Sequence, residues 1–183
     1  MRAMAAATVL MMAFFAATPT YAQSEPLARA RQGEVQCFEP DAANKTCAAI
    51  ASYAFAADGT INNTSDVLIF PEPAIVMHIS SPVTVRDGAV CGPIRQQDID
   101  GAQFSIDGQP ASSENTQTIR GQMHDQLASI IGVEVCSRFV PDGDGFRAVA
   151  TAGGRPQPDQ HVTWVSPSDG YHVAPPPQAP AQN

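Results

Sequence analysis

The sequence predicts an α+β domain: a mainly antiparallel sheet of several short strands with one amphipathic helix at about residues 112–131, stapled by disulfides. Three observations predict this class. Short runs rich in β-branched residues are separated by turn dipeptides such as Asp58-Gly59 and Asp87-Gly88. One segment instead repeats its apolar residues at helical spacing. Four cysteines stand far apart in the chain.

The chain begins with a pattern typical of a signal peptide. Arg2 precedes an apolar run that is shorter than the roughly 20 residues of a spanning helix. Thr20-Tyr21-Ala22 places small residues where a signal peptidase reads, so we expect cleavage after Ala22. A Sec-type signal over 1–22 would export the protein to the periplasm or the medium. No second apolar span follows it, so we expect no membrane span after its removal.

The segment after the signal has little apolar pattern. We therefore expect a loose leader over 23–32 and a single globular domain over 33–174. Within the domain, alternation and turn signals predict six strands before the helix. Pro82 should place part of its strand at an edge or a bulge, because proline has no N–H to donate. These strands are expected at 33–38, 46–55, 61–70, 75–85, 89–94 and 104–106.

The helix is predicted by its caps and its apolar stripe. Ser112 or Ser113 can accept a hydrogen bond from the first free amides, and Glu114 suits the positive end of the helix dipole. Gly132 follows the last apolar residue and suits a left-handed stop. We expect the stripe to pack on the sheet. Its members are Ile119, Met123, Leu127, Ile130 and Ile131.

Strands resume after the helix. The turn sequence PDGDG separates strands expected at 133–140 and 146–151, and a compact strand is expected at 161–165. The Pro-rich end, 175–183, cannot build a strand ladder and lacks apolar mass, so we expect it to be disordered.

The four cysteines are expected to form structural disulfides. Their spacings are too wide for a zinc site, and no Cys-x-x-Cys redox motif occurs. Three connectivities are open to four cysteines. We favour Cys37–Cys47 and Cys91–Cys136, because the first pair brackets a turn-rich loop. Disulfides agree with an oxidising, exported location.

The charge balance bears on partners. The chain carries 18 acidic and 10 basic residues, a net charge of −8, and Lys45 is its single lysine. An acidic surface argues against nucleic acid as a partner. The partner we expect is an unidentified envelope or periplasmic protein.

Motifs for chemistry are few. Asp142 and Asp144 resemble half of a calcium loop, but position twelve of such a loop would be Gly153 instead of Glu. The four histidines are scattered, and no serine stands in a Gly-x-Ser-x-Gly or Ser-x-x-Lys motif. We therefore expect no metal and no cofactor, and we name no catalytic residue.

One segment is the candidate binding region. HVTWVSPSDGYHVAP holds the single tryptophan, Trp164, with Tyr171, His161 and His172 close by in sequence. Aromatic and polar groups together are common at binding surfaces. Trp164 is expected in the core, because Val162 shares its strand face, and Tyr171 is then the expected exposed aromatic.

Several elements together resemble a group of small exported proteins from alphaproteobacteria that has no assigned activity. They are VQCFEPD, KTC, AVCGPI, VPDGDGF and VTWVSPSDGYHVAP. The resemblance implies a bacterial, exported protein and adds no catalytic residue. We accordingly expect a small periplasmic domain that binds a protein or an envelope component without catalysis. The alternative is a small periplasmic hydrolase whose site is assembled only in space.

Overall fold

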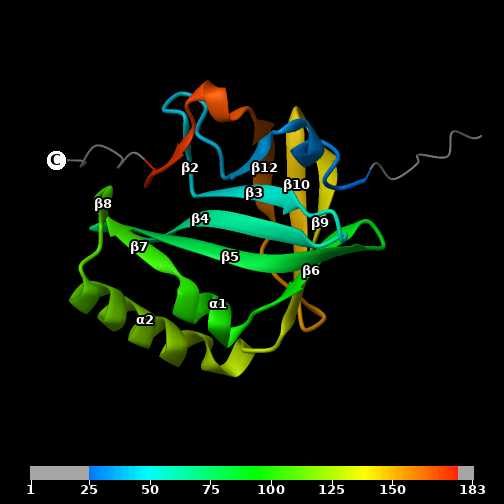
Figure 1. Cartoon of the computed structure of the whole chain (residues 1–183). Coiled ribbons are helices and arrows are strands. Elements are labelled where there is room, and N and C mark those ends of the chain that lie inside the picture. Colours follow the sequence, from blue (N-terminus) through cyan, green and yellow to red (C-terminus); the bar gives the residue numbers. More distant parts are fainter. Residues whose placement is uncertain (1–24, 177–183) are drawn as a thin grey trace, which may run out of the picture.

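The fold is a closed antiparallel barrel of eight strands, seen in a computed structural model that describes residues 25–176 (Figure 1). The expected signal peptide at 1–22 and residues 177–183 of the expected tail lie outside this range. Most barrel strands lie within one or two residues of their predicted positions. They are β1 Val35–Phe38, β3 Ala49–Phe55, β4 Ile61–Pro71, β5 Ala74–Arg86, β6 Ala89–Pro93, β9 Glu134–Asp142, β10 Gly145–Ala152 and β12 Gln160–Val165.

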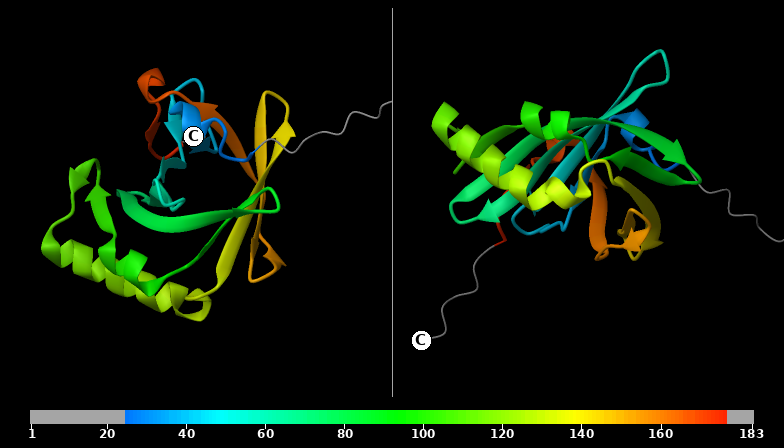
Figure 2. Two further views of the ribbon diagram at one scale, coloured as in Figure 1. Left: turned by 45° about the vertical axis from the view of Figure 1, so that its right-hand side comes forward. Right: turned by 90° about the horizontal axis from the view of Figure 1, so that it is seen from below.

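The pairing of β4 with β5 closes the barrel. The strand order is β4-β3-β1-β12-β10-β9-β6-β5, and β5 then pairs back onto β4 from Ile61↔Val83 to Pro71↔Ala74. The left view of Figure 2 shows the strands arranged as a ring. The predicted α+β class, a sheet covered on one face by a helix, is therefore wrong. The protein is mostly β. Its sheet closes on itself, so the inner face of the sheet is covered by the opposite wall of the barrel and not by a helix alone.

Strand β5 pairs with β4 along one edge and with two different strands along its other edge. Its residues 75–78 pair with β7, Gln103–Ile106, whereas residues 84–86 pair with β6. Pro82 lies between these two stretches and faces Asn62 of β4 on the other side. Proline is tolerated there because the second edge of β5 has no ladder to complete at that point.

Two helices lie beside β7 (Figures 1 and 2). The predicted helix is confirmed as α2, Ser113–Leu127, continued by the 3-10 turn η2, Ala128–Ile130. Ser112 caps α2 by accepting a hydrogen bond from the Asn115 amide at 3.2 Å. Its buried Ile119 packs with Met77 and Phe104, which belong to β5 and β7. The short α1, Gln96–Gly101, was not predicted.

The residues before β1 are packed against the barrel. Leu27 is completely buried, and Ala30 begins the 3-10 turn η1, Ala30–Gln32. Both pack in one core cluster with Trp164. The Arg31 guanidinium lies over the Phe55 ring, 3.9 Å from its centroid. Within the segment 25–32, which was expected to be a loose leader, Leu27 and Ala30 are thus buried against the barrel.

The two disulfides have the connectivity that the sequence analysis favoured. Cys37 of β1 is bonded to Cys47 of β2, Thr46–Cys47, and so fixes β2 to the barrel wall. There β2 pairs in parallel with β13, His172–Val173. Both bonds fit an exported, non-cytoplasmic protein.

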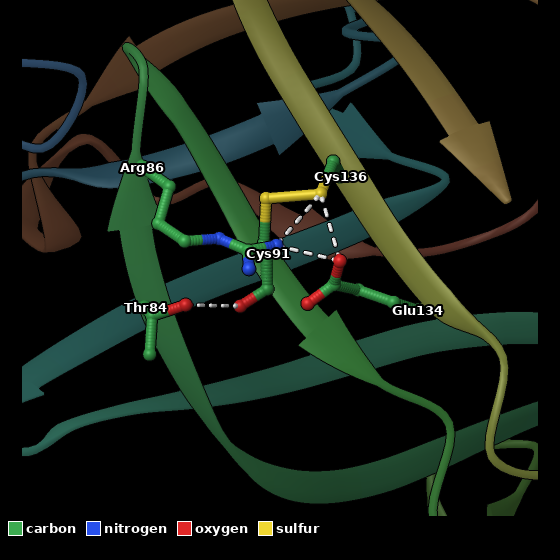
Figure 3. Close-up of polar contacts among 5 residues, drawn as sticks. All are labelled: Thr84, Arg86, Cys91, Glu134 and Cys136. Carbon is green, nitrogen blue, oxygen red and sulfur yellow. Dashed lines mark hydrogen bonds and ion pairs between the residues drawn. A yellow bond between two sulfur atoms is a disulfide. The ribbon is translucent and has the colours of Figure 1, made fainter. Parts of the chain in front are cut away.

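The second disulfide joins two neighbouring barrel strands. Cys91 of β6 and Cys136 of β9 stand directly opposite each other, with Cα atoms 4.1 Å apart. Figure 3 shows the polar contacts around this bond. The Arg86 guanidinium forms an ion pair with the Glu134 carboxylate, and the Thr84 hydroxyl donates to the Cys91 carbonyl at 3.4 Å. These contacts reinforce the junction of β5, β6 and β9.

Three small elements complete the described chain. None of them joins the ring: β8 pairs with β7, and β11 pairs with β10. They are β8 Gln109–Pro110, β11 Arg155–Pro156 and the 3-10 turn η3 Pro167–Asp169.

Candidate functional site

The barrel contains a cavity of about 470 Å³ that is open to solvent. Side chains alternate between the two faces of a strand, so every second residue of the wall points inward. The lining residues follow this rule in three neighbouring strands. They are Ala49, Ala51 and Tyr53 of β3, Asn63, Ser65 and Val67 of β4, and Met77, Ile79, Ser81 and Val83 of β5. Further lining comes from β6, from β9, from the segment 93–99 and from Met123 and Leu127 of α2.

Small inward side chains leave this space open. Ala49, Ala51, Ser65, Gly92 and Ser137 all line the cavity. A second inward cluster is filled instead by larger groups. Its buried members are Leu27, Ala30, Val90 and Trp164, and partly buried aromatic and aliphatic side chains pack against them. The barrel interior therefore has a packed part around Trp164 and an unfilled part, the cavity.

One wall of the cavity carries a buried ion pair. Asp98 of α1 has a side chain only 6% exposed, and Arg95, three residues earlier, donates to it from Nε at 2.9 Å and from Nη2. The Ser81 hydroxyl donates to the same carboxylate at 2.8 Å. Burial acts to raise the pKa of Asp98, but the hydrogen bonds from Arg95 and Ser81 outweigh it and hold the pKa below its usual value. Asp98 is thus a carboxylate at neutral pH.

Tyr53 of the cavity wall forms a buried hydrogen bond with Gln36, which does not itself line the cavity. The Tyr53 hydroxyl donates to Gln36 Oε1 at 2.8 Å, and burial raises the pKa of Tyr53 well above its ordinary value. Gln36 is completely buried and stands opposite Ala51 in the register, so both are on the inner face. Its Nε2 amide has no hydrogen-bond partner.

None of the four residues of the candidate binding segment lines the cavity. Trp164 lies in the core and is 6% exposed. Tyr171 is partly buried and packs against the Cys37–Cys47 cluster, in contrast to the exposed position expected for it. His161 and His172 are exposed.

Two of these four residues lie together in an outer groove. His161 and Tyr171 line a depression of about 540 Å³ with Glu39, Asp142 and Asp144. Asp142 is 3.8 Å from Arg147 in an ion pair, and the Glu39 carboxylate accepts a hydrogen bond from the His161 amide at 2.9 Å. The PDGDG carboxylates therefore belong to an acidic groove at the β9–β10 turn. Within 25–176, no group of three or more acidic, histidine or cysteine side chains is placed to hold a metal ion.

Sequence reasoning missed the cavity residues. The inward positions of β3 and β4 carry Ala, Asn and Ser where a filled core would carry larger apolar groups. Small residues at period two were the available signal. This pattern indicates a cavity only when the strands are known to form a ring, because the same small residues on an open sheet would face solvent.

Comparison with known proteins gave no matching family, no matching curated protein and no matching solved structure. In the described part of the chain, no helix has the length and apolar character needed to cross a membrane.

Proposed function

We propose that the protein binds one small, mostly apolar ligand inside the barrel. The observation that carries this proposal is the cavity of about 470 Å³ within a closed eight-stranded ring. Eight-stranded barrels are wide enough to hold one small ligand, and ligand cavities in proteins commonly have volumes of about 300–1,000 Å³.

The lining indicates the kind of ligand. Valine, isoleucine, leucine, methionine and phenylalanine side chains dominate the wall, and a few polar groups interrupt it. The ion pair of Arg95 with Asp98 is one polar point, and the hydroxyl of Tyr53 is another. The ligand should therefore have an apolar body and at least one hydrogen-bonding group.

Chemistry on the ligand is not part of this proposal. Among the described residues that line the cavity there is no histidine and no cysteine, and the carboxylate bonded to Ser81, that of Asp98, is paired with Arg95. The proposal narrows the expected envelope component to a small molecule that fits this cavity. A protein partner at the candidate binding segment stays a prediction.

The disulfides support an exported protein, and the resemblance to small exported alphaproteobacterial proteins agrees with that location. Export by a Sec-type signal at 1–22 and a periplasmic or secreted site of action are part of the proposal. The ligand would then be met in the cell envelope or in the medium.

The test is a titration with the apolar fluorescent probe N-phenyl-1-naphthylamine. The wild-type protein should enhance its fluorescence at one saturable site. Ser65→Phe places a ring in the cavity, whereas Thr64→Phe places the same ring on the outer face of β4. The two substitutions are matched, because each removes one side-chain hydrogen bond.

Ser65→Phe should weaken probe binding about tenfold or more, since each 1.4 kcal/mol of lost interaction is a factor of ten. Thr64→Phe should bind like the wild type. Equal binding by both variants, or no saturable binding by the wild type, would contradict the proposal.

A further inference from the structure

The outer face of the barrel wall carries a serine, a histidine and an aspartate in one line across three strands. Asp66 of β4 stands directly opposite His78 of β5, and Asp66 Oδ1 lies 2.7 Å from His78 Nδ1. His78 Nε2 lies 3.2 Å from the hydroxyl of Ser105 on β7. Ser105 is one step diagonal to His78, because the register pairs His78 with Gln103.

The two contacts fit one tautomer of the neutral imidazole. A carboxylate can only accept hydrogen bonds, so we assign the proton of the neutral ring to Nδ1, which donates to Asp66. Nε2 then holds the lone pair and accepts from the Ser105 hydroxyl. A base that accepts the proton of a hydroxyl nucleophile while a third group orients the base is the arrangement of nucleophilic acyl-transfer sites.

We propose that these three residues form a second site that hydrolyses carboxylic esters, with Ser105 as nucleophile, His78 as general base and Asp66 as positioning residue. Ser105 Oγ bonds to the ester carbonyl carbon while its proton passes to His78 Nε2. The bond from that carbon to the alcohol oxygen then breaks, and His78 returns the proton to the leaving alcohol. Water, deprotonated by His78, releases the acid from the acyl-serine and restores the hydroxyl.

Gln103 is placed to stabilise the oxyanion of this reaction. It precedes Ser105 by two residues on β7, so the two side chains share one face of the strand. It also stands opposite His78 in the register. A glutamine amide is one of the side-chain donors that can stabilise a tetrahedral oxyanion.

The site is open to solvent and separate from the cavity. The side chains of His78 and Asp66 are 39% and 45% exposed, so an ester can approach from solution. Met77 and Ile79, on either side of His78, point into the cavity instead. Because Asp66 is anionic and the chain has a net charge of −8, the favoured substrates are uncharged esters.

The same outer face offers a matched control. The Thr64 hydroxyl donates to Ser80 Oγ at 3.3 Å, one cross-strand pair away from Asp66 and His78. Ser80 is thus an outward serine of β5 that is bonded to a hydroxyl instead of to an imidazole. A serine that is merely exposed should behave like Ser80.

The test uses a fluorophosphonate probe on the folded, oxidised protein. Attack by Ser105 Oγ on phosphorus displaces fluoride, and peptide mass spectrometry locates the adduct. We expect the phosphonyl group on Ser105 and not on Ser80. His78→Gln should lower the labelling rate about 100-fold or more, which is typical for loss of a general base. Ser80→Ala should label at the wild-type rate.

Turnover provides the second measurement, with p-nitrophenyl acetate as substrate. The wild type should show an acyl-enzyme burst that Ser105→Ala abolishes, and Asp66→Asn should lower kcat more than it changes KM. Circular dichroism should show that these surface variants remain folded. The proposal is overturned if Ser105 and Ser80 label equally, if His78→Gln labels like the wild type, or if Ser105→Ala keeps the burst. Probe binding inside the barrel is measured separately, so either site can fail without the other.

Discussion

The hydroxyl of Ser81 donates a 2.8 Å hydrogen bond to the carboxylate of Asp98 and so joins β5 to α1. Asp98 also forms an ion pair with the guanidinium of Arg95. Helix α1 therefore places a buried carboxylate, paired with Arg95 and Ser81, on the cavity wall. A buried carboxylate with these partners stabilises the fold only while it is ionised.

Asp98→Asn should destabilise the protein in a pH-dependent way. The folded-state pKa of Asp98 lies below the ordinary pKa of an aspartate, so its contribution is fully present above that ordinary pKa and disappears as the pH falls through the lower folded-state pKa. At pH 7 we expect a loss of roughly 2 kcal/mol in the free energy of unfolding. Urea unfolding of both proteins from pH 7 to pH 2 measures the difference.

Asp100→Asn is the control for this measurement. Asp100 belongs to the same helix, but its side chain is 55% exposed. Its substitution should change the free energy of unfolding by no more than about 0.5 kcal/mol. A pH-independent effect of Asp98→Asn would show that the carboxylate charge is not what stabilises this wall.

Gly145→Ala should be destabilising, although it adds only a methyl group. A Cβ atom at Gly145 would lie 2.8 Å from the Val162 carbonyl oxygen, so the backbone of β10 or β12 must move. We expect a loss of about 1–3 kcal/mol in urea unfolding. Gly121→Ala in α2 meets no atom within 4 Å and should instead stabilise by about 0.5–1 kcal/mol. Equal effects at the two positions would contradict the close approach of β10 to β12.

Local patterns predicted the elements, and non-local pairings decided what they build. The strand around Ile61–Phe70 and the helix capped by Ser112 could be read from period and caps, because those signals lie within a few residues. Closure depends on β1 pairing with β12 and on β6 pairing with β9, strands that lie far apart in the sequence. No local pattern encodes that choice, so the sheet was expected to be covered by a helix instead of closed.

The positions of the candidate site residues could be predicted from the sequence only in part. The inside position of Trp164 follows from its strand period, but Tyr171 was placed outside and packs on the Cys37–Cys47 cluster. Asp66, His78 and Ser105 come from three separate strands, and their alignment depends on two registers. A histidine and a serine 27 residues apart give no local signal of contact.

Trp164→Ala should be among the most damaging single substitutions. The side chain is 6% exposed and packs with Leu27, so its removal leaves a cavity that costs about 3–5 kcal/mol. Thermal unfolding followed by circular dichroism measures the loss. Phe70→Ala is the control, because Phe70 is 51% exposed and should cost far less. Similar losses for both variants would contradict the packing of Leu27 and Trp164 at the core.

The two disulfides should differ in how much they stabilise. On the chain-entropy account, Cys91–Cys136 spans 45 residues and contributes about 4 kcal/mol, whereas Cys37–Cys47 spans 10 and contributes about 3 kcal/mol. Double alanine variants of each pair, compared by urea unfolding, should rank in that order. Non-reducing digestion should recover the two linked peptide pairs, and recovery of a different pairing would refute the connectivity.

Strands β4 and β5 form a partition that is one residue thick. Met77 and Ile79 face the cavity while His78, between them, faces solvent, and Asp66 has the same relation to Ser65 and Val67. A bound ligand that displaces Met77 or Ile79 must also shift the backbone of β5, and His78 would move with it. The imidazole resonances of His78 should therefore report, from outside the barrel, whether its interior is occupied.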